Sequence, residues 1–276
     1  MWVRALLILL IAGTQLWAYV PRRTLTASGL AFEKWSDSSF PLTWRLNGSS
    51  NLAEVFRRAF QTWANVSTAR VSFMEGAQTS ITDAARDGVN LISVSPAVYN
   101  SDARSLTILY TVSTPAAGQF PGQILEADIL FNPQILLSTD TNVPPDRFDL
   151  QSLAVHEIGH LLGLDHSGLA SAAMFPNIAQ GSTLMRTLST DDIVGISNLY
   201  PAADYFITRG SVQGTVRTPA GSPVFGAHVV VTDGTGRPAA AALTELDGSK
   251  RFRIKHPIQH SRRDLPWRAV RRRLCH

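Results

Sequence analysis

Three of the chain's seven histidines lie in the stretch HEIGHLLGLDH at 156–166. His156 and His160 are four residues apart, so on a helix both imidazoles project from one face, one turn apart. A third ligand has to come from outside the helix, so the chain must turn back after it. Gly163 can take a positive φ and permits that turn, which brings His166 to the same point. Three neutral nitrogens with an open fourth position suit catalytic zinc.

Glu157 follows the first of these histidines and lies on an adjacent face of the expected helix. That position is unsuited to a fourth ligand but lies within reach of a metal-bound water. Zinc lowers the pKa of bound water to about 7 and polarises a carbonyl group. A carboxylate beside that water can take its proton and later pass it to a leaving amine. The pattern therefore predicts metal-assisted hydrolysis of an amide bond.

Two other interpretations of the stretch stay open. The first is a core helix whose histidines hydrogen-bond to carbonyl groups. In that case the spacing, with the added glycine and third histidine, would be a chance match, which is expected in about 1 in 100,000 chains. The second is a structural zinc site, which would normally close the fourth position with another protein ligand. The single cysteine, Cys275, is far along the chain and excludes an intrachain disulfide.

The elements that must position these residues follow from hydrophobic periodicity and turn residues. Asp149 is the expected N-cap of the histidine-bearing helix, and Gly163 its stop. Strands are expected at 40–47, 70–75, 89–95, 105–112 and 123–131, an amphipathic helix over 50–67, and a last helix over 188–201. The order predicts an α+β domain with a helix behind a mixed sheet.

The stretch HEIGHLLGLDHS resembles the long zinc-binding motif of the metzincin clan, and Asp165 and Ser167 make it similar to the matrixin branch, the matrix-metalloproteinase-like peptidases. That family has a methionine turn under the metal with a proline close behind, which Met174 and Pro176 match. PLTWRLN, VFRRAFQTWANVS and LSTDDIVGISNLYP resemble its first strand, first helix and last helix. The resemblance covers about residues 30–201 and implies a metzincin-type zincin domain with a twisted mixed sheet, long helices, an active-site helix and a methionine turn.

The resemblance implies a zinc endopeptidase acting on protein or peptide substrates. Its zinc ligands would be His156, His160 and His166, its general base Glu157, and its supporting residues Gly163, Met174 and Pro176. Strand 105–112 is expected to form the upper edge of the cleft and to pair with an extended substrate. Residues 174–177 are expected to wall the pocket that follows the scissile bond.

Further metals have little support in the sequence. Leu130 stands where the family has a histidine ligand of a second zinc, so one zinc is expected. Calcium has only the support of Asp128, and a surface charge is the favoured interpretation of that residue.

Composition divides the chain further. Residues 1–18 are interpreted as a signal peptide cleaved near Ala18, with a membrane anchor as the alternative. Residues 19–29 are expected to be a short linker and 30–205 the catalytic domain. Residues 209–248 resemble the start of a carboxypeptidase regulatory-like β-sandwich, truncated before a basic tail at 249–276 that is expected to be disordered.

The charge distribution argues against a nucleic-acid partner. Of the 25 basic and 21 acidic residues, ten and one lie in 249–276, so residues 1–248 hold 15 and 20, a net charge of −5. The positive charge therefore belongs to the tail. The expected protein is secreted or extracellular (periplasmic in a bacterium), is a monomer and is not stably inserted in a membrane once the signal is removed.

Two other functions compete with a general endopeptidase. One is a non-catalytic secreted zinc-containing binding or adhesion protein, against which the intact Glu157 speaks. The other is a peptidase dedicated to one protein, which the sequence does not separate from broad proteolysis. Because the expected cleft lies before residue 201, a chain cut after Asp204 is expected to keep its zinc and its activity.

Overall fold

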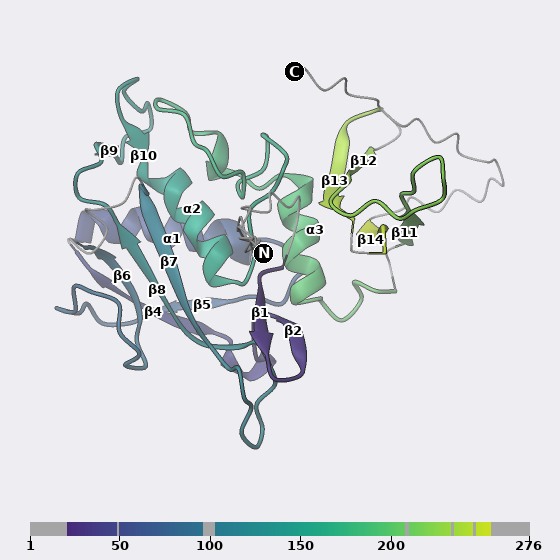
Figure 1. Cartoon of the computed structure of the whole chain (residues 1–276). Helices are drawn as coiled ribbons and strands as arrows, with labels where there is room; N and C mark the ends of the chain where they lie inside the picture. Colours follow the sequence, from purple (N-terminus) through teal and green to yellow (C-terminus); the bar gives the residue numbers. More distant parts are fainter. Residues whose placement is uncertain are drawn as a thin grey trace, which may run out of the picture.

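The computed structural model describes residues 21–48, 50–95, 103–207, 210–232, 235–244 and 247–254. The predicted signal peptide at 1–18 and the tail beyond 254 lie outside these residues. Figure 1 shows a domain of sheet and helices, with a separate group of C-terminal strands beside its last helix. Among the described helices, none combines the length and the apolar character needed to cross a membrane.

The domain is built on a mixed sheet, as the sequence predicted. Its strands are β3 (Lys34–Trp35), β4 (Leu42–Asn47), β5 (Phe73–Glu75), β6 (Asn90–Val94), β7 (Ser105–Thr111) and β8 (Gln123–Phe131). Neighbours in the order β3-β8-β6-β4-β5 are parallel, and β7 pairs antiparallel with β8. Within the described residues, β7 pairs with no strand other than β8.

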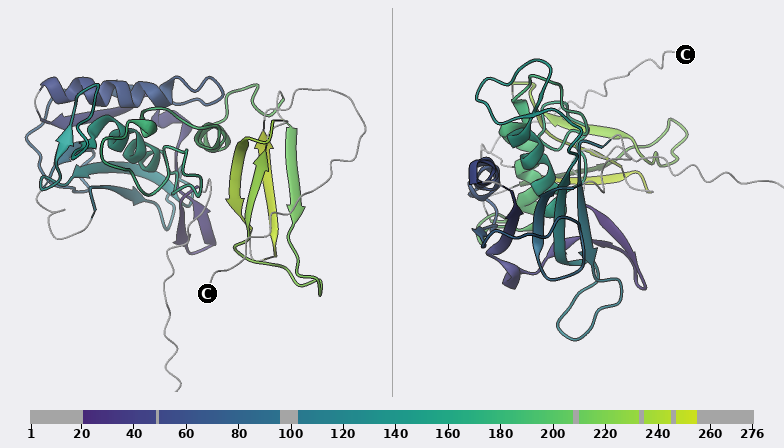
Figure 2. Two further views of the ribbon diagram at one scale, coloured as in Figure 1. Left: turned by 90° about the horizontal axis from the view of Figure 1, so that it is seen from above. Right: turned by 90° about the vertical axis from the view of Figure 1, so that its left-hand side faces the viewer.

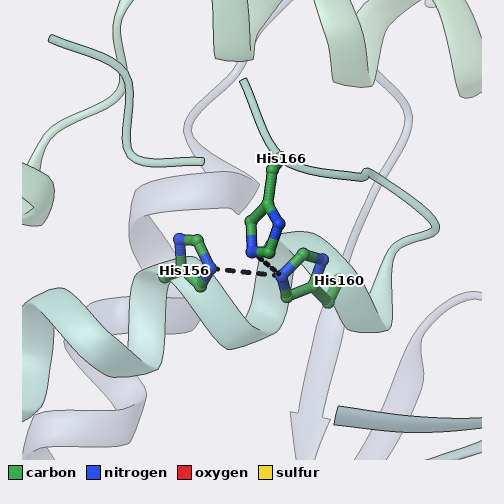
Figure 3. A group of neighbouring side chains, drawn as sticks. All are labelled: His156, His160 and His166. Atoms are coloured by element: carbon green, nitrogen blue, oxygen red, sulfur yellow. Dashed lines mark hydrogen bonds between the residues drawn. The ribbon is translucent and has the colours of Figure 1, made fainter. Parts of the chain in front are cut away.

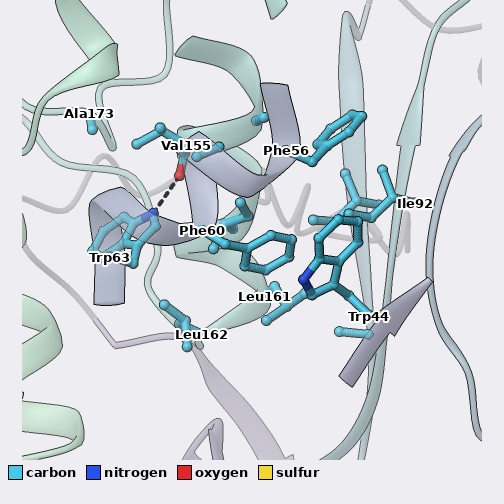
Figure 4. Close-up of a cluster of buried hydrophobic side chains, with 14 of the residues drawn as sticks. Trp44, Phe56, Phe60, Trp63, Ile92, Val155, Leu161, Leu162 and Ala173 are labelled. Atoms are coloured by element: carbon cyan, nitrogen blue, oxygen red, sulfur yellow. Dashed lines mark hydrogen bonds between the residues drawn. The ribbon is translucent and has the colours of Figure 1, made fainter. Parts of the chain in front are cut away.

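Helices α1 (Ser50–Ala64) and α2 (Leu150–Leu161) pack together against the sheet. The Trp63 indole of α1 donates to the carbonyl of Val155 in α2 at 2.8 Å (Figure 4). The ring of Phe60 stacks on Trp44 of β4, with centroids 4.8 Å apart. The third helix, α3 (Thr190–Leu199), begins with a capping box and lies between α2 and the C-terminal strands (Figure 2, left).

The N-terminal segment is a hairpin attached to the domain, so the expected linker at 19–29 is wrong. Strand β1 (Arg23–Thr26) pairs antiparallel with β2 (Gly29–Phe32). The N–H of Arg22 donates to the carbonyl of Gly163 at 2.7 Å, and Pro21 forms a bridge with Leu164. The strands have four residues each and are largely exposed, which hid them from pattern analysis, and the contact with Gly163 is long-range.

The remaining short elements are a pair of strands and two 3₁₀ turns. Strands β9 (Leu137–Ser138) and β10 (Phe148–Asp149) pair in parallel. The described part of the domain also has two 3₁₀ turns, η1 (Asp37–Ser39) and η3 (Leu184–Arg186).

The C-terminal β-unit, residues 210–254, contains two antiparallel strand pairs. They are β11 (Gly210–Thr215) with β14 (Ser249–Ile254), and β12 (His228–Thr232) with β13 (Pro238–Leu243). The predicted start of a disordered tail at 249 is therefore wrong. The apolar positions of SKRFRI alternate with polar ones, and β11 supplies six partner residues. The high basic content of the tail obscured that alternation.

The C-terminal β-unit contacts the domain through α3. Val194 of α3 forms a small buried cluster with Ala240 and Ala242 of β13. At the same contact the N–H of Ala241 donates to Oδ1 of Asp191 at 2.8 Å, in a buried hydrogen bond. The unit is thus joined to the domain by small side chains and a backbone-to-carboxylate bond.

Candidate metal centre

Helix α2 begins where the sequence predicted. Oδ2 of Asp149 accepts from the N–H of Ser152 at 2.9 Å, which satisfies a free donor of the first turn. Asp149 is fully buried, and the Arg186 guanidinium pairs with it at 2.7 Å. The helix start is therefore held both by its own cap and by the segment around η3.

The end of α2 turns the chain back toward the metal. The N–H of Gly163 donates to the carbonyl of His160 at 2.8 Å, and that of Leu164 to the carbonyl of Gly159 at 2.9 Å. These two bonds with a left-handed residue form a Schellman motif, and Gly163 has φ +89° as predicted. A Cβ on Gly163 would overlap the carbonyl oxygen of Glu33, so the N-terminal segment also requires glycine here.

The three histidines meet with their Nε2 atoms (Figure 3). Nε2 of His160 lies 3.1 Å from that of His156 and 3.2 Å from that of His166. Nδ1 of His156 is 2.7 Å from the carbonyl of Ala173, and Nδ1 of His160 is 2.8 Å from that of Leu164. A carbonyl only accepts, so these Nδ1 atoms carry the protons and the Nε2 lone pairs face one another. Converging lone pairs repel unless a cation lies between them, which is the donor set that zinc takes.

Burial favours the metal-binding form of two of the three rings. Desolvation, followed by the neighbouring histidines, lowers the pKa of His160 well below its usual value. Desolvation and then the nearby His156 lower the pKa of His166 to about 4. Both rings are therefore neutral at neutral pH, and the neutral imidazole is the form that binds a metal.

Met174, the expected floor of the site, is 2% exposed and packs against Gly159 of α2. A Cβ on Gly159 would overlap the Met174 sulfur and come within 2.9 Å of Trp63, so glycine is needed on this face of α2. The N–H groups of Ala173 and Met174 donate to the two oxygens of Asp192, at 2.8 and 3.1 Å. The methionine turn is thereby fixed to the start of α3.

Glu157 lies beside the histidines and is 4% exposed. Its Oε1 accepts from Oγ of Ser105 at 2.7 Å, and its Oε2 from Oγ1 of Thr107 at 2.6 Å. Sequence reasoning missed both hydroxyls. The sequence did carry a signal for them, because Ser105 and Thr107 are polar residues on the side of β7 where apolar ones are expected.

Asp191 is a second residue whose role was missed. Its Oδ2 accepts from Oγ of Ser167 at 2.7 Å, while its Oδ1 accepts the backbone of Ala241. Ser167 follows His166 directly. The sequence marked Asp191 only as one of two acids at the start of a helix.

A cleft of about 430 Å³ opens over this group. It is lined by the three histidines, Glu157, residues 105–107 of β7 and, on one wall, Phe175 and Pro176. Of the residues expected to wall the cleft, Phe175 and Pro176 line it, while the buried Met174 and the exposed Asn177 do not. Arg22, Arg23 and Arg104 also border it, which the sequence did not indicate.

The expected surface charge at Asp128 is wrong. The residue is 1% exposed, and its two oxygens accept from the N–H groups of Leu91 and Ala85 at 3.0 and 3.2 Å. Burial raises its pKa to about 6. Leu130 lies in an apolar cluster with Leu91. Across the described ranges, the three histidines are the sole group of three or more metal-ligand side chains that converge on one point.

Comparison with known proteins agrees with this geometry. The profile of the family described as Matrixin matches residues 34–201. Metalloendoproteinase 2-MMP of Arabidopsis thaliana is 29% identical over 225 residues, covering 76% of this chain and 54% of the relative. Metalloendoproteinase 4-MMP of the same plant is 32% identical, with coverages of 55% and 40%. Human matrix metalloproteinase-16 is 29% identical, with coverages of 57% and 25%. The chain spans about half the length of these relatives, or less.

Proposed function

The chain belongs to the matrixin family, and from that membership we propose that it is a secreted zinc-dependent endopeptidase. The observation that carries the proposal is the convergence of three Nε2 lone pairs beside a buried carboxylate. His156, His160 and His166 would hold one zinc ion. Bound zinc would acidify a water and polarise the scissile carbonyl.

Glu157 is the proposed general base. Its carboxylate takes a proton at one Oε atom and returns it to the leaving amine, which is the work of a base and then of an acid. Burial at 4% exposure keeps bulk water from competing for that proton. Asp149, Gly163 and the two carbonyls that fix the histidine tautomers orient the groups around it.

The edge of β7 away from β8 is the proposed substrate-binding edge. An extended peptide adds to such an edge through backbone hydrogen bonds, and its alternate side chains enter the cleft. Phe175 and Pro176 would wall the pocket for the side chain after the scissile bond. The proposed substrates are proteins or peptides in extended conformation.

Several further expectations belong to the proposal. Residues 1–18 would direct secretion, and 209–248 would form part of a carboxypeptidase regulatory-like module that is not catalytic. The chain would act as a monomer. Calcium is possible but has weak support, because Asp128 is a single carboxylate, is 1% exposed, and calcium takes about six to eight oxygen ligands. The alternative of a zinc-containing binding protein is disfavoured, since such a protein has no need of Glu157.

Glu157→Gln tests the proposal directly. The amide keeps the shape of the side chain but cannot accept the proton, so hydrolysis of casein should fall by about 100-fold or more. Zinc content, measured by elemental analysis, should stay at the wild-type level. A chelator should abolish wild-type activity in parallel. Wild-type turnover in the variant would show that another group is the base.

A further inference from the structure

Strand β7 carries hydroxyl residues where its position in the fold calls for apolar ones. Side chains alternate along a strand, so Ser105, Thr107 and Leu109 share one face. Leu109 packs on the main core, and Thr107 pairs across the sheet with the buried Ile129. The face that carries Thr107 is therefore turned toward α2.

Both hydroxyls donate to the same carboxylate. Oγ of Ser105 lies 2.7 Å from Oε1 of Glu157, and Oγ1 of Thr107 lies 2.6 Å from Oε2. Oγ1 of Thr107 is also 3.1 Å from the Glu157 carbonyl oxygen, but a hydroxyl has one proton and the shorter contact takes most of it. Burying a hydroxyl costs free energy unless it is hydrogen-bonded, and Thr107, 5% exposed, directs both of its contacts to Glu157.

The two bonds leave the carboxylate able to act. A carboxylate has about four lone-pair sites, and the hydroxyls occupy one on each oxygen. One further site per oxygen stays available for a proton. Hydrogen bonds to a charged acceptor are shorter and stronger than neutral ones, so the pair holds a flexible side chain in one position.

We propose that Ser105 and Thr107 are positioning residues that clamp the general base to the strand on which the substrate is expected to bind. This inference rests on the proposed function of Glu157. A base must lie within hydrogen-bond reach of the proton it takes, and displacement by about 1 Å can cost about 100-fold in rate. The clamp fixes the base relative to β7, and so relative to a peptide added to that strand.

The test compares Thr107→Val with Thr107→Ser in the full chain. Valine keeps the branched shape and removes the hydroxyl, so kcat should fall about tenfold while KM changes by less than about twofold. Serine keeps the hydroxyl and should restore most of kcat. The Ser105→Ala/Thr107→Val double variant should lose about 100-fold. Zinc content should be unchanged in each.

Thr68→Val is the matched control. Thr68 forms a hydroxyl hydrogen bond of 2.7 Å with Ser197, away from the cleft, so its loss should leave kcat unchanged. Glu157→Gln separates the two proposals. If that variant is inactive while Thr107→Val is fully active, the clamp alone is refuted. If Glu157→Gln keeps wild-type activity, or if the wild type itself is inactive, Glu157 is not the general base. Both proposals are then wrong.

A crystal structure of the metal-free double variant gives a readout that does not depend on turnover. Without the clamp, the Glu157 carboxylate should shift or occupy more than one rotamer, whereas the wild type should hold one. An unchanged carboxylate, or a loss of kcat in Thr107→Ser equal to that in Thr107→Val, would overturn the inference in favour of simple packing.

Discussion

Glycines occur both in the metal-binding stretch and in the C-terminal β-unit, and they differ in how closely other parts of the chain approach them. Around α2, glycines lie against large neighbours: Gly159 against Met174 and Trp63, and Gly163 against the backbone of Glu33. In the C-terminal β-unit, Gly214 and Gly221 have nothing within 4 Å of an added Cβ. Gly248 of the same unit does meet a distant segment, since an added Cβ would lie 2.5 Å from the carbonyl oxygen of Val216. Close approach of distant segments is therefore a feature of both regions, and Gly214 and Gly221 are the positions that lack it.

The contact between the regions is narrow. It buries Ala240, Ala242 and Val194 and shares Asp191, which also accepts from Ser167 next to the metal ligand His166. The residues that could bind the metal therefore lie in a region where several segments of the chain pack closely together. One carboxylate thus joins the C-terminal β-unit to the segment that carries His166.

The largest contrast is expected between two glycine substitutions with the same backbone requirement. Gly163 and Gly221 have φ of +89° and +88°. Gly221→Ala should cost about 1 kcal/mol, the penalty for a left-handed residue. Gly163→Ala adds an overlap with Glu33 and should cost roughly 3 kcal/mol in total. Chemical denaturation measures both, and equal costs would remove the packing difference on which the comparison rests.

A smaller effect is expected at the shared carboxylate. Asp191→Asn leaves one acceptor where there were two, so the free energy of unfolding should fall by about 1–2 kcal/mol. In a chain cut after Ile207, the Ala241 donor is absent and the same substitution should cost less. Thermal unfolding of the four proteins forms a double-mutant cycle. Equal losses of unfolding free energy in the long and short chains would show that the hydrogen bond from Ala241 to Asp191 does not link the two regions.

Removal of the C-terminal β-unit should lower stability modestly without removing chemistry. The cut predicted after Asp204 would delete Tyr205, which is 2% exposed, so the structure moves it to a position after Ile207. The shortened chain should keep its zinc and peptidase activity. Its melting temperature should fall by roughly 2–4 °C for each kcal/mol lost. Loss of zinc from a folded short chain would make the unit part of the catalytic domain.

The smallest effect is expected from mild acid. A proton competes with zinc only when it can bind the ligand nitrogen. The pKa of His166 is lowered to about 4 and that of His160 also lies well below its usual value. Proton competition at His166 should therefore begin only as the pH approaches about 4, and zinc affinity should fall steeply in that range. Titration with a competing chelator measures this, and an affinity that shows no further fall near pH 4 would contradict it.

Local patterns predicted much of this arrangement. The caps at Asp149 and Ser189, the turn at Gly163 and the strands β4 to β8 each depend on residues close together in the sequence. The ligand set follows from the spacing of one helix and one turn.

The missed features arise from contacts between distant segments. Ser105 lies 52 residues from Glu157, and Ala241 lies 50 residues from Asp191. No periodicity encodes such a pairing. Strand β3 is two residues long, and β14 is rich in arginine and lysine, so neither stands out from composition.

The central claim is that one zinc ion binds per chain through His156, His160 and His166. Elemental analysis of the purified full chain, dialysed against trace zinc, tests it most directly, with His160→Ala as the matched sample. The account predicts close to one equivalent in the wild type and close to none in the variant. Two equivalents in the wild type, or one retained in His160→Ala, would contradict it.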